Sequence, residues 1–547
     1  MLPRGGTAHR AGGAPVRRRT LLAALGTPAL GGLGACTRGE PRRFDGGWVG
    51  APSERGHRLR DPSVVVAGDR GVPAGRCDVV IVGAGIAGLA CARALVRAGV
   101  DDIVLLELED APGGNSRAHR LGGSGCPLAA HYLPVPGEHA REVTELLFDL
   151  GLLRHEAGRT VPDERHLCHS PQERLFFDGA WHEGLLPPAA AASRSAAQYR
   201  AFGERVEAVR REAAFAMPAL RAPWRAAHAA LDAVTCASWL GREGFDDPLL
   251  RWYLDYACRD DYGAGASQVS AWAGLHYFAS RHGFQPPGDD GADREPVFTW
   301  PEGNAWLAER LAAPLRDRIR SAHTALRVDA ARHAVQVMAF DERAQRGVRF
   351  DGKAVVLATP LFVARQLWSA PSPALRAAGE RARYAPWLVA NLLLDAPLLE
   401  RAGGPQLAWD NVRHGSPSLG YVAAQHQSLR ADVRATVLTA YWALPGDERA
   451  QLLGGHWRAW AQRVVDDLAL AHPDLPRKLR RIDLARYGHA MRVPLPGARS
   501  DPALAALNAA RGRVQFAHAD LAAYSVFEEA YTIGVLAAQR VLRELRR

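Results

Sequence analysis

The chain has 547 residues, of which 48% are apolar and 23% are charged, and its formal net charge at pH 7 is +10. A chain of this length buries a large core and predicts two domains. Residues 1–35 hold five arginines and no acidic residue, so 63 basic and 58 acidic residues follow them, a net charge of +5. These basic residues are scattered arginines without a basic stripe or interleaved aromatic rings, which excludes nucleic acid as an expected partner.

The first 35 residues are predicted to be an export signal. Arg17-Arg18-Arg19 precedes a mildly apolar, Gly- and Ala-rich stretch, a pattern that resembles a twin-arginine (Tat) signal. Leu33-Gly34-Ala35-Cys36 resembles a bacterial lipobox, in which Cys36 receives a lipid and becomes the new N-terminus. We therefore expect export by Tat and a lipid-anchored protein in the periplasm or on the cell surface. A disordered basic leader of a cytosolic protein is the alternative.

Residues 36–74 are rich in Gly, Pro and Arg and show no sustained apolar period, so we predict a linker there. A dinucleotide-binding unit follows. An apolar strand (78–82) leads into a glycine-rich turn and an Ala- and Leu-rich helix, and a second apolar strand (103–106) ends in Glu107. The glycines of the turn are Gly83, Gly85 and Gly88.

Each part of this unit has a physical role in holding a dinucleotide. The first glycine allows a tight turn, the second lets a pyrophosphate approach the backbone, and the third lets helix and strand pack closely. The N–H groups and the positive dipole end of the helix face the phosphates. Glu107 is placed to accept hydrogen bonds from ribose hydroxyl groups. An ordinary tight turn would not need all these parts in register, so we predict dinucleotide binding.

The residues after Glu107 indicate which dinucleotide is bound. The chain continues Asp110-Ala-Pro-Gly-Gly-Asn-Ser-Arg117. This resembles the Gly-Gly segment after the second strand in FAD enzymes of the glutathione-reductase-like superfamily, particularly the flavin-containing amine oxidase family. The resemblance implies FAD contacts from Gly113, Gly114, Asn115 and Ser116.

The C-terminal part of the chain carries the second half of the resemblance. Residues 512–520 resemble the family's last strand, which implies that Asp520 binds the ribityl chain. Residues 527–534 resemble the start of the family's final helix, whose first N–H groups face the flavin pyrimidine ring. In this chain those groups belong to Glu528, Glu529 and Ala530. The two matches occur in the family's order, so FAD is the predicted cofactor.

The middle of the chain suggests how two domains are interleaved. Short strands at 325–328, 334–340 and 347–350, followed by an apolar run at 354–358, resemble the family's three-stranded meander feeding back into a parallel sheet. In the family a backbone group of the residue matching Val328 contacts adenine. The predicted fold is α/β, with a Rossmann-like FAD-binding domain and a mixed α+β substrate domain. The predicted FAD-domain segments are 75–135, 296–368 and 478–547, and the substrate-domain segments are 136–295 and 369–477.

The catalytic positions depart from the family pattern. Many flavin amine oxidases have a lysine that holds a water at flavin N5, but this chain has two lysines only, Lys353 and Lys478, and neither fits that role. Asn391, in a strand beginning at Tyr384, stands near the lysine position. Its amide is a candidate for holding a water, and a hydrogen bond at the strand end is the alternative.

The aromatic cage of monoamine oxidases is also not reproduced. Ala490 and Val526 fall at the two cage positions, and Tyr524 is a candidate substitute. His489 falls where monoamine oxidases have a flavin-linked cysteine. Covalent attachment, noncovalent contact at the flavin edge and a structural role all remain open for it. His131 follows the dinucleotide unit where family members approach the flavin, and we predict that it lies in the site.

Aromatic residues near carboxylates are further candidates. Such groups receive a cationic amine by cation–π and ionic attraction, whereas core aromatics with satisfied polar tips are the alternative. The clusters concerned are 260–263, 272–278, 409–411 and 419–426, including Asp260, Trp409 and Asp410. We find no cluster with metal-ligand spacing in the sequence.

These observations predict an exported FAD-dependent oxidoreductase of the amine oxidase type. It takes a hydride from a small-molecule amine or polyamine to flavin N5, and oxygen or another electron acceptor completes turnover. The lost lysine and cage keep open a desaturase, dehydrogenase or isomerase of an apolar substrate, of the phytoene-desaturase or protoporphyrinogen-oxidase type. A catalytically silent flavin-binding partner protein is the third alternative.

Overall fold

The computed structural model describes residues 44–50, 53–61, 64, 72–286, 296–401, 403–423, 426 and 435–546. Residues Arg42–Arg547 form one compact unit. The predicted export signal and Cys36 lie outside the described residues. None of the described helices is both long enough and apolar enough to span a bilayer.

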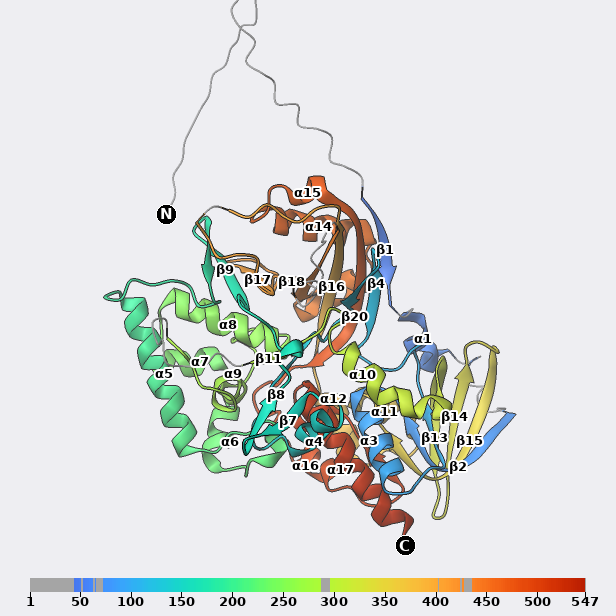
Figure 1. The fold of residues 1–547 in the computed structure, drawn as a ribbon. Helices are drawn as coiled ribbons and strands as arrows, with labels where there is room; N and C mark the ends of the chain where they lie inside the picture. Colours follow the sequence, from blue (N-terminus) through green and yellow to red (C-terminus); the bar gives the residue numbers. More distant parts are fainter. Residues whose placement is uncertain are drawn as a thin grey trace, which may run out of the picture. The chain divides into compact units, whose positions relative to one another are not determined.

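A seven-stranded sheet carries the dinucleotide-binding unit (Figure 1). Its central strand β2 (Val72–Val82) pairs in parallel with β3 (Ile103–Leu106) and with β15 (Arg346–Leu357), and β15 pairs in parallel with β21 (Val514–Phe516). The other strands are β12 (Ile319–Arg320), β13 (His323–Ala330) and β14 (Val335–Asp341). β13, β14 and the first half of β15 form an antiparallel meander, so the predicted meander joined to a parallel sheet is confirmed.

The pattern of small and apolar residues explains this layer. The end of β2 is Val-Val-Ile-Val and is buried on both faces, as expected for a central parallel strand. Helix α3 (Ile86–Arg97) ends just before Gly99, which has a φ of +84°. The long final helix α17 (Phe527–Leu545) packs against α3.

An eight-stranded sheet forms the second layer, with strand order β1-β20-β16-β19-β18-β17-β9-β10. One face of this sheet is apolar and is covered by α14 (Trp457–Ala469). The other face meets the hairpin of β4 (Ala118–Leu121) and β5 (Ser124–Pro127), for instance through Asn391. The eight strands are β1 (Asp45–Val49), β20 (Leu479–Arg492), β16 (Tyr384–Leu394), β19 (Thr436–Ala443), β18 (Tyr421–Ala423), β17 (Asp410–Arg413), β9 (Glu173–Phe177) and β10 (Ala180–Glu183).

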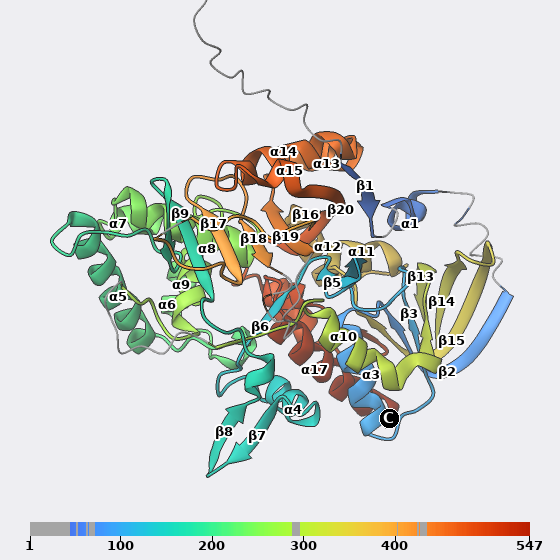
Figure 2. The ribbon, with the colours of Figure 1, turned by 45° about the horizontal axis from the view of Figure 1, so that its top comes forward.

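A group of helices packs together around α9, and both views show its member α8 beside β9 and β17 (Figures 1 and 2). They are α5 (Arg194–Glu212), α6 (Ala226–Asp232), α7 (Cys236–Arg242), α8 (Pro248–Tyr262) and α9 (Ala271–Ala279). The remaining strands are β6 (Tyr132–Pro134), β7 (Leu153–Glu156), β8 (Arg159–Pro162) and β11 (Val297–Thr299). The remaining helices are α1 (Ser53–His57), α4 (Arg141–Asp149), α10 (Ala305–Ala312), α11 (Leu361–Leu367), α12 (Pro373–Arg381), α13 (Arg449–Gly454), α15 (Leu475–Lys478) and α16 (Pro502–Asn508).

Two predicted boundaries are wrong. The predicted linker 36–74 contains β1, which pairs in parallel with β20, and β2 already begins at Val72. β1 is a Gly-rich strand at the edge of its sheet, and hydrogen bonds to β20 hold it in place, so it needs no apolar period that the sequence would reveal. β20 belongs to the second sheet, so residues 479–492 do not join the first sheet as the predicted boundary at 478 implied.

Candidate active site

The three glycines of the turn at the start of α3 differ in what surrounds them. Gly83 has a φ of +103°, and a Cβ atom there would lie 2.5 Å from the Ala358 carbonyl oxygen. A Cβ atom at Gly88 would lie 1.9 Å from the Gly83 carbonyl oxygen. These two glycines are therefore required by protein packing. At Gly85 the nearest atom to an added Cβ is the Cα atom of Gly114, at 3.8 Å, so Gly85 keeps open a space that protein atoms do not fill.

The Gly-Gly segment lies directly against this turn. The N–H of Gly113 donates to the carbonyl of Ala84 at 2.8 Å, and Gly113 forms a parallel bridge with Gly85. The Ser116 N–H closes the segment on the Gly113 carbonyl at 2.9 Å. The structure thus brings the two predicted phosphate-contacting segments together without side chains between them.

Glu107 occupies the end of β3 as predicted. It is 5% exposed, and its two carboxylate oxygens accept the N–H groups of Ala84 at 2.8 Å and of Glu109 at 3.0 Å. Burial raises the pKa of Glu107 to about 7 despite these two donors. Each oxygen keeps a further acceptor site, so the carboxylate can accept two ribose hydroxyl groups, and such bonds favour its ionised form.

Two buried polar atoms without partners lie in the segments that follow β21 and β15. In Asp520, Oδ2 accepts the Leu361 N–H at 2.9 Å and the Tyr384 hydroxyl, but Oδ1 has no hydrogen-bond partner. Its neighbour at 3.2 Å is the Nδ1 of His518, which already accepts the Asp520 N–H. The Thr359 hydroxyl is also buried without a partner. Buried polar groups are rarely left unpaired, so these atoms fit the hydroxyl groups of a ribityl chain at the carboxyl ends of parallel strands.

At the start of α17, two of the three N–H groups predicted to face the flavin lie in the first turn of the helix. Its first residue is Phe527, and the N-cap residue Val526 makes no side-chain cap. Glu528 and Glu529 therefore place their N–H groups in the first turn. The N–H of Ala530 instead donates to the carbonyl of Val526 at 3.2 Å, so the predicted flavin contact of Ala530 is wrong.

Val328 does not lie next to Glu107, where its predicted adenine contact would place it. The backbone of β13 meets Glu107 at His323, whose N–H donates to the Glu107 carbonyl at 2.8 Å. Val328 lies five residues further along the strand, about 16 Å away at the usual rise per residue. Its carbonyl accepts the Ser369 N–H at 3.0 Å. The start of β13, rather than Val328, borders the nucleotide end of the site.

His131 lies in an aromatic cluster next to the Gly-Gly segment. The Ala130 N–H donates to the Asn115 carbonyl at 3.0 Å, which sets the position of His131. Its ring stacks on Tyr441, with 4.4 Å between ring centroids, and lies 5.4 Å from the ring of Trp409. Burial lowers the pKa of His131 to about 4, so the imidazole is neutral at pH 7.

His489 also approaches the Gly-Gly segment. The Asn115 side-chain amide donates to the carbonyl of Ala490, the next residue, at 2.8 Å. The exposed His489 ring lies 4.8 Å from the ring of Phe362. This position suits the predicted contact at the flavin edge.

Asn391 and Tyr524 have local structural partners instead. Asn391 is fully buried in the middle of β16; its amide N–H donates to the Pro127 carbonyl at 3.1 Å, and its oxygen accepts the Thr439 hydroxyl at 2.7 Å. The structure therefore favours the hydrogen-bonding alternative, although not at a strand end. Tyr524 is fully buried and donates to Glu529 at 2.6 Å, so its ring faces packed protein and does not line an open cavity.

One face of the eight-stranded sheet gathers acidic and polar side chains next to His131. Glu173 of β9 and Asp410 of β17 are register partners on adjacent parallel strands. The register continues from Asp410 through Val422 to Thr439, so these side chains share a face with Tyr441, two residues beyond Thr439. The hydroxyl of Tyr441, a residue that is 4% exposed, has no hydrogen-bond partner.

Helix α8 closes this group from the other side. Tyr253, Tyr256 and Asp260 are spaced three and four residues apart and so share one helix face. Burial, with the charges of Asp261 and Glu173, raises the pKa of Asp260 to about 7. Burial, with the charges of Glu173 and Asp260, raises the pKa of Asp410 well above its usual range.

We call Glu173, Asp260 and Asp410 the carboxylate cluster. Among the described residues, no side chain makes a hydrogen bond or an ion pair with Asp260 or Asp410. The sequence interpretation named these two residues but missed Glu173 and Tyr441. Strand register reveals Glu173 and Tyr441, and the register of strands that lie far apart in the chain cannot be read from the sequence. The residues that the structure describes hold no group of His, Cys, Asp or Glu arranged as metal ligands.

Comparisons with known proteins identify the family of this chain. The model of the family described as flavin containing amine oxidoreductase matches residues 86–542. Protein anon-37Cs of Drosophila lebanonensis is 34% identical over 99 residues, and the match covers 16% of this chain and 18% of that protein.

Two solved structures show the same fold. A putrescine oxidase with bound putrescine has a TM-score of 0.64 at 16% identity, over 86% of this chain and 99% of that one. A protein from Exiguobacterium sp. 255-15 assigned as a protoporphyrinogen oxidase has a TM-score of 0.57 at 17% identity, over 87% of this chain and all of that one.

Proposed function

Because this chain belongs to the flavin-containing amine oxidoreductase family and is an FAD-dependent oxidoreductase, we propose that its substrate is an amine or a polyamine. FAD, when bound, accepts a hydride at N5 from the carbon next to the substrate nitrogen. That C–H bond breaks, the substrate leaves as an iminium ion, and oxygen or another acceptor takes the two electrons.

The residues that fit the cofactor are those of the first sheet. Gly85 leaves room for the pyrophosphate, and Glu107 offers acceptors to the adenosine ribose. The unpartnered Oδ1 of Asp520 offers an acceptor to the ribityl chain.

The carboxylate cluster is the observation that supports an amine. Among the described residues no side chain forms an ion pair with Asp260 or Asp410, which are both partly buried, and a cationic ligand would stabilise their ionised forms. The tyrosines of α8 and β19 add aromatic rings near these carboxylates, and aromatic rings attract cations. A carboxylate with a raised pKa also accepts the proton that the ammonium group must lose before hydride transfer. Putrescine, held by the putrescine oxidase above, carries two such groups.

An apolar substrate fits these residues less well, because it would offer no positive charge to the partly buried carboxylates of Asp260 and Asp410. Anaerobic mixing of the purified yellow protein with polyamines, amino acids and prenyl lipids tests the proposal. We expect a polyamine to bleach the flavin. Bleaching by a prenyl lipid alone would support the desaturase alternative, and no bleaching would support the silent binding protein.

We also propose export by Tat and lipid attachment at Cys36, on the basis of the Arg17-Arg18-Arg19 pattern and the lipobox. Mass spectrometry of the N-terminal peptide from the membrane fraction tests this. The expected peptide begins with a lipid-modified Cys36, and the double variant Arg17→Lys/Arg18→Lys should remain unprocessed.

A further inference from the structure

We propose that the segment before the nucleotide-binding unit retains the adenosine half of FAD by fixing the loop that carries Glu107. The segment consists of β1 and residues 53–61, and we call it the N-terminal clasp. It precedes residue 86, where the family model begins to match. Its contacts connect the two sheets.

One end of the clasp is anchored on the second sheet. β1 pairs in parallel with β20 from Asp45 to Val49. The guanidinium of Arg486 lies 4.6 Å from the centre of the Trp48 ring, on the same strand pair. Five register pairs and a cation–π contact make this a fixed attachment and not a trailing end.

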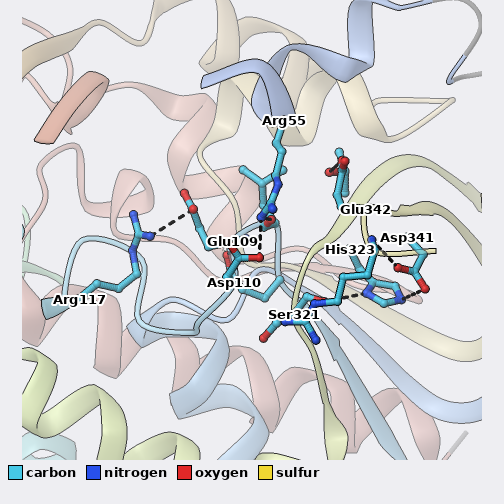
Figure 3. A network of polar contacts seen from close by, with 12 residues as sticks. Arg55, Glu109, Asp110, Arg117, Ser321, His323, Asp341 and Glu342 are labelled. Atoms are coloured by element: carbon cyan, nitrogen blue, oxygen red, sulfur yellow. Dashed lines mark hydrogen bonds and ion pairs between the residues drawn. The ribbon is translucent and has the colours of Figure 1, made fainter. Parts of the chain in front are cut away.

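The other end reaches the loop after Glu107. Arg55 donates from Nη1 to the carbonyl of Leu108 at 3.2 Å and to Oδ1 of Asp110 at 3.0 Å (Figure 3). The Asp110 side chain is 66% exposed, so the ion pair contributes little. The Arg55 side chain is only 17% exposed, and its bond to the Leu108 carbonyl fixes the backbone next to Glu107.

Arg58 holds the neighbouring hairpin. Its Nε donates to both oxygens of Glu342, at 2.8 and 2.9 Å, and the Glu342 side chain is 3% exposed. Glu342 also accepts the hydroxyl of Thr324 at 2.7 Å. The Arg58 guanidinium lies 5.2 Å from the ring centre of Phe340.

Backbone hydrogen bonds connect this hairpin to Glu107. The N–H of Glu342 donates to the carbonyl of Ala322 at 2.9 Å, and the N–H of Ala322 donates to the carbonyl of Glu109 at 2.8 Å. His323 donates to the carbonyl of Glu107 itself. Arg55 thus contacts the 107–110 loop directly, and Arg58 contacts Glu342, whose backbone is linked to the loop through Ala322; Figure 3 shows Arg55 beside Asp110 and the position of Glu342.

Arg55 and Arg58 are therefore positioning residues for the cofactor. Glu107 binds the ribose only when its carboxylate is held in place, and a loop ordered before binding loses less entropy when the ligand arrives. Without the arginines the loop must be ordered by FAD itself. The expected result is weaker binding of the adenosine half, while the flavin half, held by β21 and α17, is unaffected.

The test uses the full-length apoprotein, from which FAD has been removed, and measures the dissociation constants of ADP and of riboflavin. We expect Arg55→Ala/Arg58→Ala to weaken ADP binding at least tenfold, to speed FAD release by a similar factor and to leave riboflavin binding unchanged. Arg60→Ala is the matched control, since Arg60 is an exposed arginine of the same segment. It should leave ADP binding unchanged.

Unchanged ADP binding in the double variant would overturn the proposal. So would an equal loss of ADP and riboflavin binding together with a lower Tm of the apoprotein, because that pattern shows a purely structural role. If the double variant does not fold, Arg55→Gln alone gives the same comparison. None of these measurements depends on amine oxidation, so they stand apart from the proposed substrate.

Discussion

Replacing Asp410 by Asn tests the proposed substrate most directly. Asp410 and Glu173 are register partners on adjacent parallel strands, and the charge of Glu173 contributes to the raised pKa of Asp410. At an effective dielectric constant of 20, an ammonium group about 4 Å from a carboxylate gains about 4 kcal/mol. After desolvation, a hydrogen bond to a charged group contributes about 1.5–3 kcal/mol, which corresponds to roughly a 10- to 100-fold change in binding.

The assay compares kcat/KM for putrescine with kcat/KM for butylamine, which has the same carbon chain and one amino group fewer. We expect Asp410→Asn to lower the ratio of the two values 10- to 100-fold. Glu204→Gln, which changes an exposed carboxylate on α5, is the matched control and should leave the ratio unchanged.

Thermal unfolding separates binding from structure. Because Asn removes the repulsion with Glu173, we expect the unliganded variant to have a Tm no lower than that of the parent protein. A clearly lower Tm with an unchanged substrate ratio would refute the reasoning, since it would show that Asp410 stabilises the fold and does not bind substrate.

Three further predictions concern the same sites. Gly85→Ala should fold, because its Cβ meets no protein atom closer than 3.8 Å, but it should lose FAD because the Cβ enters the space kept for the pyrophosphate. Gly88→Ala should fail to fold, because its Cβ lies 1.9 Å from the Gly83 carbonyl oxygen. Measurements of Tm and of flavin content distinguish the two variants. FAD affinity of the apoprotein should rise with pH through about 7, where Glu107 ionises, and Glu107→Gln should abolish that dependence in titrations at pH 6 and 8. The folded-state pKa of Asp260 is about 7 and lies above the unfolded value of 3.8, so its contribution to stability is complete below pH 3.8 and is lost as the pH rises to 7. Between pH 6 and pH 8 only about one pH unit of that window remains, so the unliganded protein should be more stable at pH 6 by about 1.4 kcal/mol, and Asp260→Asn should reduce that difference in denaturant unfolding.

The sequence determined the cofactor, and its predicted binding residues lie in local motifs. The glycine turn, the Gly-Gly segment and Glu107 lie within one stretch of about 30 residues, where spacing along the chain sets spacing in three dimensions. Asp520 belongs to a second local motif, in the short 3-10 helix after β21, and its Oδ1 has no hydrogen-bond partner.

The tertiary structure alone decided the substrate side. Glu173 and Asp410 are far apart in the chain, and only the parallel register of β9 and β17 makes them partners. The register of β13 places His323 rather than Val328 next to Glu107. The Ala530 N–H donates within helix α17 and is therefore not available to the flavin. β1 became part of the second sheet because β20 supplies its hydrogen bonds. Local motifs carry their geometry with them, whereas a cluster built from several strands and a helix exists only after those elements have packed together.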